Sequence, residues 1–170
     1  MAGRLWPAIG SLAFFVLAPA AVGGLIPQRI SRWRMQAPFF AWAGLRPLGA
    51  GLILTGTVVL LDCFARFALQ GRGTPAPVYP TERLVVGGWY RYVRNPMYVA
   101  VLSVVLGQAL LLGSRGLLTY AALLGVAFHL FVLLYEEPTL RGRYGAGYTA
   151  YCAAVRRWWP RLRPWPGNGP

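Results

Sequence analysis

The sequence has few acidic residues and no lysine. Its only carboxylate side chains belong to Asp62, Glu82, Glu136 and Glu137, and its seventeen basic residues are all arginine, so the net charge is +13. Such a charge can indicate nucleic-acid binding, but nucleic-acid binders usually gather it on a soluble face or a tail. Here the arginines flank long apolar segments, as they do in membrane proteins. We therefore expect no nucleic-acid partner.

Cysteine and histidine are also scarce. Cys63 and Cys152 lie far apart, and the one histidine, His129, stands in an apolar run. This pattern does not match the clusters that bind zinc, and two distant cysteines do not form a disulfide framework. The sequence therefore predicts neither a metal site nor a disulfide-stabilised fold.

Apolar residues, in contrast, make up 56% of the 170 residues and give a mean hydropathy of +0.48. They form four segments, approximately 5–26, 45–69, 97–113 and 117–135. At about 1.5 Å per helical residue, each segment is close to the ~30 Å needed to cross a bilayer. We therefore predict an all-α integral membrane protein, a single domain over 1–170 with about four transmembrane helices, a cytoplasmic connecting loop and an amphipathic C-terminal helix.

The distribution of arginines predicts the orientation. With four spans, both termini and the second loop share one side, and twelve of the seventeen arginines fall on that side. The positive-inside rule places that side in the cytoplasm, and the arginine-rich, lysine-free composition suggests a bacterial inner membrane. The first segment has an alternative interpretation, because Arg4 and the small residues 18–20 also fit a cleaved signal peptide. We favour a retained span, since the charge before the apolar stretch is weak.

The third predicted span begins with a motif that can bind an anion. In "RYVRNPMY", Asn95 can cap the helix and Pro96 then takes its first position. The free backbone N–H groups of such a helix start attract anions such as carboxylates, and Tyr90 and Tyr98 lie nearby in the sequence. The plainer interpretation is a well-capped membrane helix with interfacial aromatic residues.

Two adjacent glutamates follow the fourth predicted span on the same side. Glu137 has Arg141 four residues later, which predicts a local ion pair. Glu136 has no cation at that spacing, and an ionisable group at the edge of a membrane is a functional candidate. Glu136 could instead pair with an arginine of the second loop. If it does not, its position requires a cation from elsewhere.

An anion site, an unpaired carboxylate and aromatic residues together suit a zwitterion that carries a further positive charge. S-adenosylmethionine is such a molecule: its ammonium would pair with a carboxylate, its carboxylate with N–H donors, and its sulfonium with aromatic faces. From the physical argument alone it is one candidate among several.

The order of the motifs narrows the choice. "ERLVVGGWYRYVRNPMY", an apolar hairpin and then "EEPTLRGRYGAGYTAYCAAVRRWWP" resemble the isoprenylcysteine carboxyl methyltransferase family, which belongs with the phospholipid N-methyltransferases. The resemblance covers about half of the chain, in segments 81–98 and 136–160 and the hairpin between them. It implies an integral membrane methyltransferase that uses S-adenosylmethionine.

The resemblance also implies site residues. Tyr144, Gly145, Tyr148 and Tyr151 would form the helix that covers the pocket. Positions 129 and 132 would contact the methyl acceptor, and these are His129 and Val132 in this chain. The residues implied for cofactor binding are Glu82, Arg83, Leu84, Val85, Tyr90, Asn95, Pro96, Met97, Tyr98 and Glu136.

Two departures from the family pattern bear on the chemistry. Asn95 stands where the family usually has histidine, so acid–base catalysis from this position is not expected, because an amide does not titrate near neutral pH. Val132 stands where the carboxyl methyltransferases have an arginine associated with the substrate. A carboxylate acceptor would therefore lose its expected partner, and the resemblance supports the cofactor better than it supports prenylcysteine as the acceptor.

We therefore predict S-adenosylmethionine-dependent methyl transfer at the cytoplasmic membrane face. The acceptor would be amphiphilic or small, such as a lipid, isoprenoid, thiol or carboxylate, and the sequence identifies no catalytic base. One alternative is a membrane sterol-type reductase that uses NADPH. Another is a non-enzymatic membrane protein that binds lipid or a partner through its basic tail. The oligomeric state is open.

Overall fold

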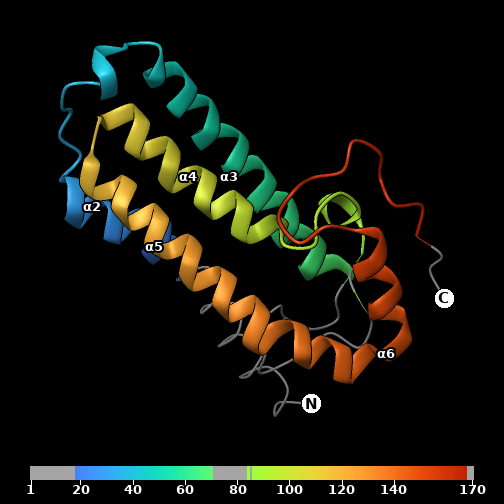
Figure 1. The fold of residues 1–170 in the computed structure, drawn as a ribbon. Helices are drawn as coiled ribbons and strands as arrows, with labels where there is room; N and C mark the ends of the chain where they lie inside the picture. The colour runs from blue at the N-terminus through green and yellow to red at the C-terminus, as the bar shows by residue number, and fades with distance from the viewer. Residues whose placement is uncertain (1–17, 71–83, 85, 168–170) are drawn as a thin grey trace, which may run out of the picture.

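The computed structural model describes residues 18–70, 84 and 86–167, and the regular elements in this part of the chain are all helical. Helices α3, α4 and α5 lie side by side, α2 packs at one end of α4 and α5, and α6 turns back at the other end (Figure 1). In chain order the elements are η2 (Ala21–Leu25), α2 (Ile26–Ser31), η3 (Phe39–Ala41), α3 (Leu45–Gln70), η4 (Gly88–Arg91), α4 (Pro96–Leu112), α5 (Arg115–Phe131), η5 (Val132–Glu136) and α6 (Glu137–Ala154).

Glycines set the close packing of α3 against α4. A Cβ atom on Gly49 would lie 2.5 Å from the carbonyl oxygen of Gly107, and one on Gly56 would lie 2.8 Å from that of Ala100. Both separations are too short for a side chain, so the two backbones touch directly. Small residues commonly allow such contact between membrane helices, where packing rather than hydrophobic burial drives association.

A tight hairpin joins α4 to α5, as the sequence predicted. Gly113 ends α4 with φ of 69°, a left-handed conformation that favours glycine. Ser114 then caps α5 by accepting a hydrogen bond from the N–H of Leu117 at 3.4 Å. The two helices therefore run antiparallel, and the start of α4 lies near the end of α5.

Helix α5 continues without a break through η5 into α6, and two irregularities shape this long helix. Residues Val132–Glu136 form a π-helical turn, a feature that often occurs at functional sites. Further on, Gly145 adopts φ of 52° and ψ of −125°, which breaks the helical path within α6. The last part of α6 therefore turns back toward the start of α4 (Figure 1).

The prediction of four spans is only partly confirmed. Within the described residues, two helices are long and apolar enough to cross a membrane, Leu45–Arg66 and Arg115–Ala154. The third predicted span forms α4, but its 17 residues put it among the shorter apolar helices. Most of the first predicted span, 5–26, lies outside the described residues.

The second long helix has 40 residues, which corresponds to about 60 Å. That is twice the thickness of the hydrocarbon layer, so about 20 residues are enough to cross it. We take 115–135 as the crossing segment, since the two adjacent glutamates come next.

Candidate functional site

Three segments that are distant in sequence meet where α4 begins. They are the loop and first turn at 84 and 86–98, the end of η5 with the start of α6, and residues 156–166, which we call the C-terminal strap. Ion pairs and hydrogen bonds connect the three segments. Most of the residues that the resemblance implied for the cofactor lie in the first two.

Tyr98 and Glu136 form the centre of this region. The Tyr98 hydroxyl donates a hydrogen bond to Oε2 of Glu136 at 2.9 Å. The Tyr98 ring lies 4.7 Å from that of Phe128 and 6.5 Å from that of Trp158, measured between centroids. The structure thus brings together one carboxylate and three aromatic rings from three different segments.

The start of α4 differs in one detail from the prediction. Asn95 occupies the N-cap position and Pro96 the first helical position, as expected, but the Asn95 side chain does not cap the helix. Its Nδ2 instead donates to the backbone oxygen of Arg157 at 3.2 Å. The Asn95 side chain therefore binds the strap, and no side chain caps the N–H groups of Met97 and Tyr98. A helix start of this kind can bind an anion.

The predicted ion pair between Glu137 and Arg141 is wrong. The Glu137 side chain is only 6% exposed and binds Arg157, through Nε to Oε1 at 2.6 Å and Nη2 to Oε2 at 2.9 Å. Arg94 Nη1 lies 3.0 Å from the same Oε1. Arg141 is exposed and makes no ion pair with Glu137 within the described residues. The local i,i+4 rule fails because Glu137 faces the protein interior.

Glu136 makes no ion pair within the described part of the chain, unlike its neighbour Glu137. Burial raises the pKa of Glu136 above its ordinary value, and the hydrogen bond from Tyr98 offsets only part of this effect. Burial would raise the pKa of Glu137 too, but the hydrogen bonds from Arg157 and the charge of Arg94 outweigh it and lower that pKa. Two adjacent carboxylates therefore differ in their electrostatic surroundings.

The second half of α6 covers the loop that precedes α4. Tyr148, Tyr151 and Val155 are buried there and pack against Leu84, among others. The Tyr151 hydroxyl donates to the backbone oxygen of Tyr90 at 2.6 Å. Of the residues implied for this helix, Tyr148 and Tyr151 thus face the loop, while Gly145 forms the bend.

The C-terminal strap runs along the same loop and was not predicted. Three backbone hydrogen bonds of 2.9 Å connect it to the loop, and together they pair three loop residues with strap residues. They run from the N–H of Arg94 to the oxygen of Arg156, from Arg161 to Tyr92, and from Trp165 to Arg91.

The remaining predicted site residues do not all lie near Tyr98 and Glu136 in the structure. Met97 is partly buried beside Tyr98, whereas Glu82, Arg83 and Val85 lie outside the described residues. His129 is exposed, and its Nδ1 accepts a hydrogen bond from Nε1 of Trp158 at 3.0 Å. Val132 is 1% exposed, so contact between its side chain and an acceptor stays a prediction.

The sequence interpretation missed Arg157 and Trp158 as parts of this site. The adjacent pairs "RR" and "WW" at 156–159 offered a signal, since four large side chains in a short polar segment require partners. Their partners are on other segments, and no local spacing rule could have identified them.

Comparison with known proteins now adds independent information. A family model described as phospholipid methyltransferase matches residues 45–147, more than half of the 170-residue chain. The chain belongs to the phospholipid methyltransferase family. No match was found among curated proteins or among solved structures. The family assignment confirms the resemblance and supports a membrane enzyme of the methyltransferase class.

The match extends from α3 to just beyond the bend at Gly145. It therefore includes the Asn95–Tyr98 helix start and Glu136, but it does not include the C-terminal strap. The strap therefore lies beyond the segment that the family model matches.

Proposed function

We propose that this phospholipid methyltransferase family member transfers a methyl group from S-adenosylmethionine to an amphiphilic acceptor at the cytoplasmic face of a bacterial inner membrane. The observation that carries the proposal is Glu136, a carboxylate that is hydrogen-bonded to Tyr98 and makes no ion pair within the described residues. Burying a charged group is costly unless it is paired. The ligand would supply the missing cation.

The residues present fit this cofactor. Glu136 would hold its ammonium, and the uncapped N–H groups of Met97 and Tyr98 would hold its carboxylate. The rings of Tyr98, Phe128 and Trp158 offer faces for a cation. When bound, S-adenosylmethionine supplies a methyl group on a sulfonium that is already activated for transfer. The chain's own contribution would then be to bind, orient and exclude water.

The acceptor would be lipid-like rather than a carboxylate. Val132 is apolar and buried where the carboxyl methyltransferases have a substrate-associated arginine. An uncharged or amine-bearing headgroup does not need that arginine. In the reaction the nucleophilic atom of the acceptor gains the methyl carbon as the carbon–sulfur bond breaks, and S-adenosylhomocysteine leaves. An amine acceptor would give its proton to water.

Two measurements test the proposal. We expect S-adenosylhomocysteine, but not NADPH, to raise the melting temperature of the detergent-purified protein. We also expect radiolabel from methyl-tritiated S-adenosylmethionine to enter the lipid extract of membranes that contain the protein. Stabilisation by NADPH alone would favour the reductase alternative. A well-folded protein that neither ligand stabilises would favour the non-enzymatic one.

A further inference from the structure

The C-terminal strap reaches the side of the membrane-crossing helix. Trp158 Nε1 donates to His129 Nδ1 at 3.0 Å. His129 precedes Glu136 by seven residues, or about 10 Å along the helix. Its neighbours on this exposed face, Val126 and Leu130, are apolar. At Trp158 the strap therefore lies beside the bundle, close to the edge of the hydrocarbon layer rather than out in the aqueous phase.

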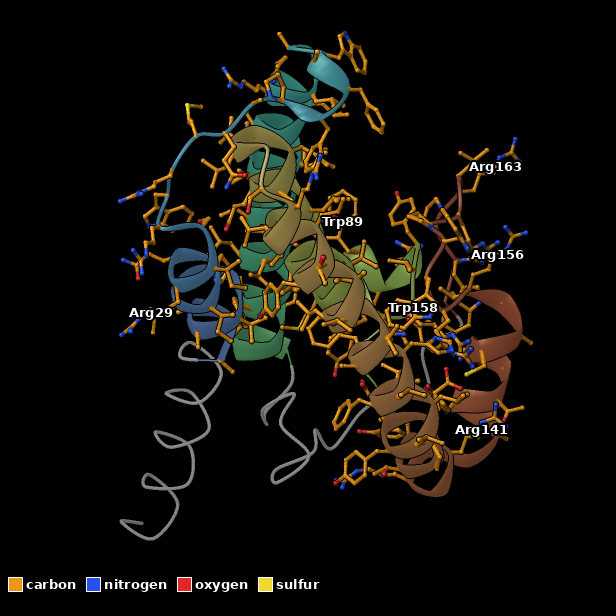
Figure 2. The ribbon with its side chains drawn as sticks, turned by 60° about the vertical axis from the view of Figure 1, so that its left-hand side comes forward. Arg29, Trp89, Arg141, Arg156, Trp158 and Arg163 are labelled. Atoms are coloured by element: carbon orange, nitrogen blue, oxygen red, sulfur yellow. The ribbon has the colours of Figure 1, made fainter. Side chains whose placement is uncertain are left out.

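The residues on either side of Trp158 in the strap expose a mixture of apolar and basic side chains. Trp159 is 74% exposed and Leu162 is fully exposed at 100%. Arg156 and Arg163 are exposed too, and they point away from the helices whereas Trp158 lies against α5 (Figure 2). Tryptophan, leucine and arginine in this arrangement are typical of segments that lie in a membrane interface.

The strap contains no carboxylate that could neutralise these arginines. Its described residues include Arg156, Arg157, Arg161 and Arg163 and no acidic residue. Arg157 is already paired with Glu137, but the exposed guanidinium groups of Arg156 and Arg163 make no ion pair within the described residues. Guanidinium groups bind phosphate oxygens in a bidentate manner.

We propose that the C-terminal strap is a docking surface for anionic phospholipid headgroups. Leu162 and Trp159 would enter the interface, and Arg156 and Arg163 would bind the headgroup phosphates. A lipid surface fits better than a soluble acidic partner, because the contact between Trp158 and His129 holds the strap beside the membrane-crossing helix, near the edge of the hydrocarbon layer. The strap lies outside the segment matched by the family, and the proposal does not depend on methyl transfer.

The strap is also the part of the chain that holds the loop before α4. Its backbone bonds to Arg91, Tyr92 and Arg94, and the bond from Asn95 to Arg157, connect it to the candidate cofactor site. Anionic lipids that hold the strap in the interface should therefore also stabilise this loop.

Limited proteolysis of the full chain in nanodiscs tests the proposal. Trypsin cleaves after arginine, and Arg161 is half-buried with its N–H bonded to Tyr92. Cleavage after Arg161 therefore requires the strap to leave the loop, and mass spectrometry measures the rate at which the peptide 162–170 is released. Nanodiscs would contain phosphatidylcholine alone or with 30 mol% phosphatidylglycerol. We expect release to be about 25-fold slower with phosphatidylglycerol, since Arg156 and Arg163 would each contribute roughly fivefold to binding.

Two charge-matched double variants separate specific docking from the effect of net charge. Arg156→Gln with Arg163→Gln should abolish the protection. Arg29→Gln with Arg32→Gln removes the same charge from α2 and its C-cap and should leave the protection intact, since Arg29 lies on the opposite side of the molecule from Arg156 and Arg163 (Figure 2). Equal release rates in the two lipid compositions, or equal loss of protection in both double variants, would overturn the proposal. Thermal melting of each variant confirms that it is folded.

Discussion

Glu136 and Glu137 are adjacent in the chain, yet their surroundings are opposite. Glu137 is nearly buried and is bound by two arginines, Arg94 and Arg157, that come from segments on either side of it. Glu136 faces Tyr98 and has no cationic partner among the described residues. Two glutamates one residue apart thus have different surroundings, and the π-helical turn ends at the first of them, Glu136.

The difference indicates which carboxylate belongs to the fold and which belongs to a ligand. A carboxylate that is fully paired with the protein's own arginines links the loop, α6 and the strap. A carboxylate whose burial raises its pKa destabilises the empty fold slightly, and such a perturbed group is a candidate for binding a ligand. On this account Glu137 maintains the shape of the site and Glu136 binds the cation of the ligand.

The largest expected effect is on stability, from Glu137→Gln. This variant leaves two largely buried arginines without their carboxylate, and breaking a buried ion pair from one side typically costs about 3–5 kcal/mol. We expect a loss of roughly 3 kcal/mol, because glutamine can still accept one of the hydrogen bonds. Denaturant-induced unfolding in detergent measures it, with Arg141→Gln as the control. A loss of less than about 1 kcal/mol would show that the cluster is not structural.

As the pH is lowered, the effects of protonating Glu136 and Glu137 should appear at different pH values. Burial raises the pKa of Glu136, so its ionised, cation-binding form is lost as pH falls through a value above the ordinary 4.5. Below that pKa, affinity for S-adenosylhomocysteine should fall about tenfold per pH unit. The pKa of Glu137 is lowered, so its contribution to stability is present above 4.5 and is lost only as pH falls through that lower value. Affinity should therefore fall before stability, and the reverse order would contradict the comparison.

A smaller effect is expected from Tyr98→Phe, which removes the only hydrogen bond that Glu136 makes within the described residues. The carboxylate would lose its orientation, and affinity for S-adenosylhomocysteine should fall about fivefold, equivalent to roughly 1 kcal/mol. Tyr120→Phe is the matched control, because its hydroxyl donates to the backbone oxygen of Val22 at the other end of α5. Titration calorimetry measures both variants, and equal effects would argue against a role for Tyr98 at the site.

The smallest effect is expected from Asn95→Ala. This change removes the hydrogen bond to the backbone oxygen of Arg157, which helps to hold the guanidinium group of Arg157 on Glu137. We expect a loss of stability of about 1 kcal/mol and a similar affinity for S-adenosylhomocysteine. Unfolding and binding measurements on the same preparation test this, and a large loss of affinity with normal stability would assign Asn95 to the ligand instead.

Local features of the fold could be predicted from the sequence. The hairpin at Gly113 and Ser114, the position of Pro96 at the start of α4, and the buried stripe of Tyr148 and Tyr151 all depend on residues that are close in sequence. Spacing rules describe such features well. The sequence also predicted that Glu136 has no local i,i+4 partner, but pairing with an arginine of the second loop stayed open, and Arg72 and Arg83 of that loop lie outside the described residues.

Features that depend on distant residues could not be predicted in this way. Arg94 reaches Glu137 across the hairpin, and Arg157 reaches it from beyond the bend at Gly145. The prediction that Glu137 pairs with Arg141 was wrong because it assumed that the Glu137 side chain faces solvent, whereas it is buried against Arg94 and Arg157. Neither the bend nor the strap has a signature in local periodicity, since both depend on how the chain returns to the start of α4.

The most direct test of this account is calorimetric titration of S-adenosylhomocysteine into the wild type, Glu136→Gln and Glu137→Gln, with unfolding measured in parallel. We expect Glu136→Gln to lose at least about tenfold in affinity, as for a charge-assisted contact, while its stability is unchanged or slightly higher because a buried charge is removed. Glu137→Gln should lose stability first, and its folded fraction should still bind. Wild-type affinity in a well-folded Glu136→Gln variant would contradict the account, because Glu136 would then not be the residue that binds the cofactor.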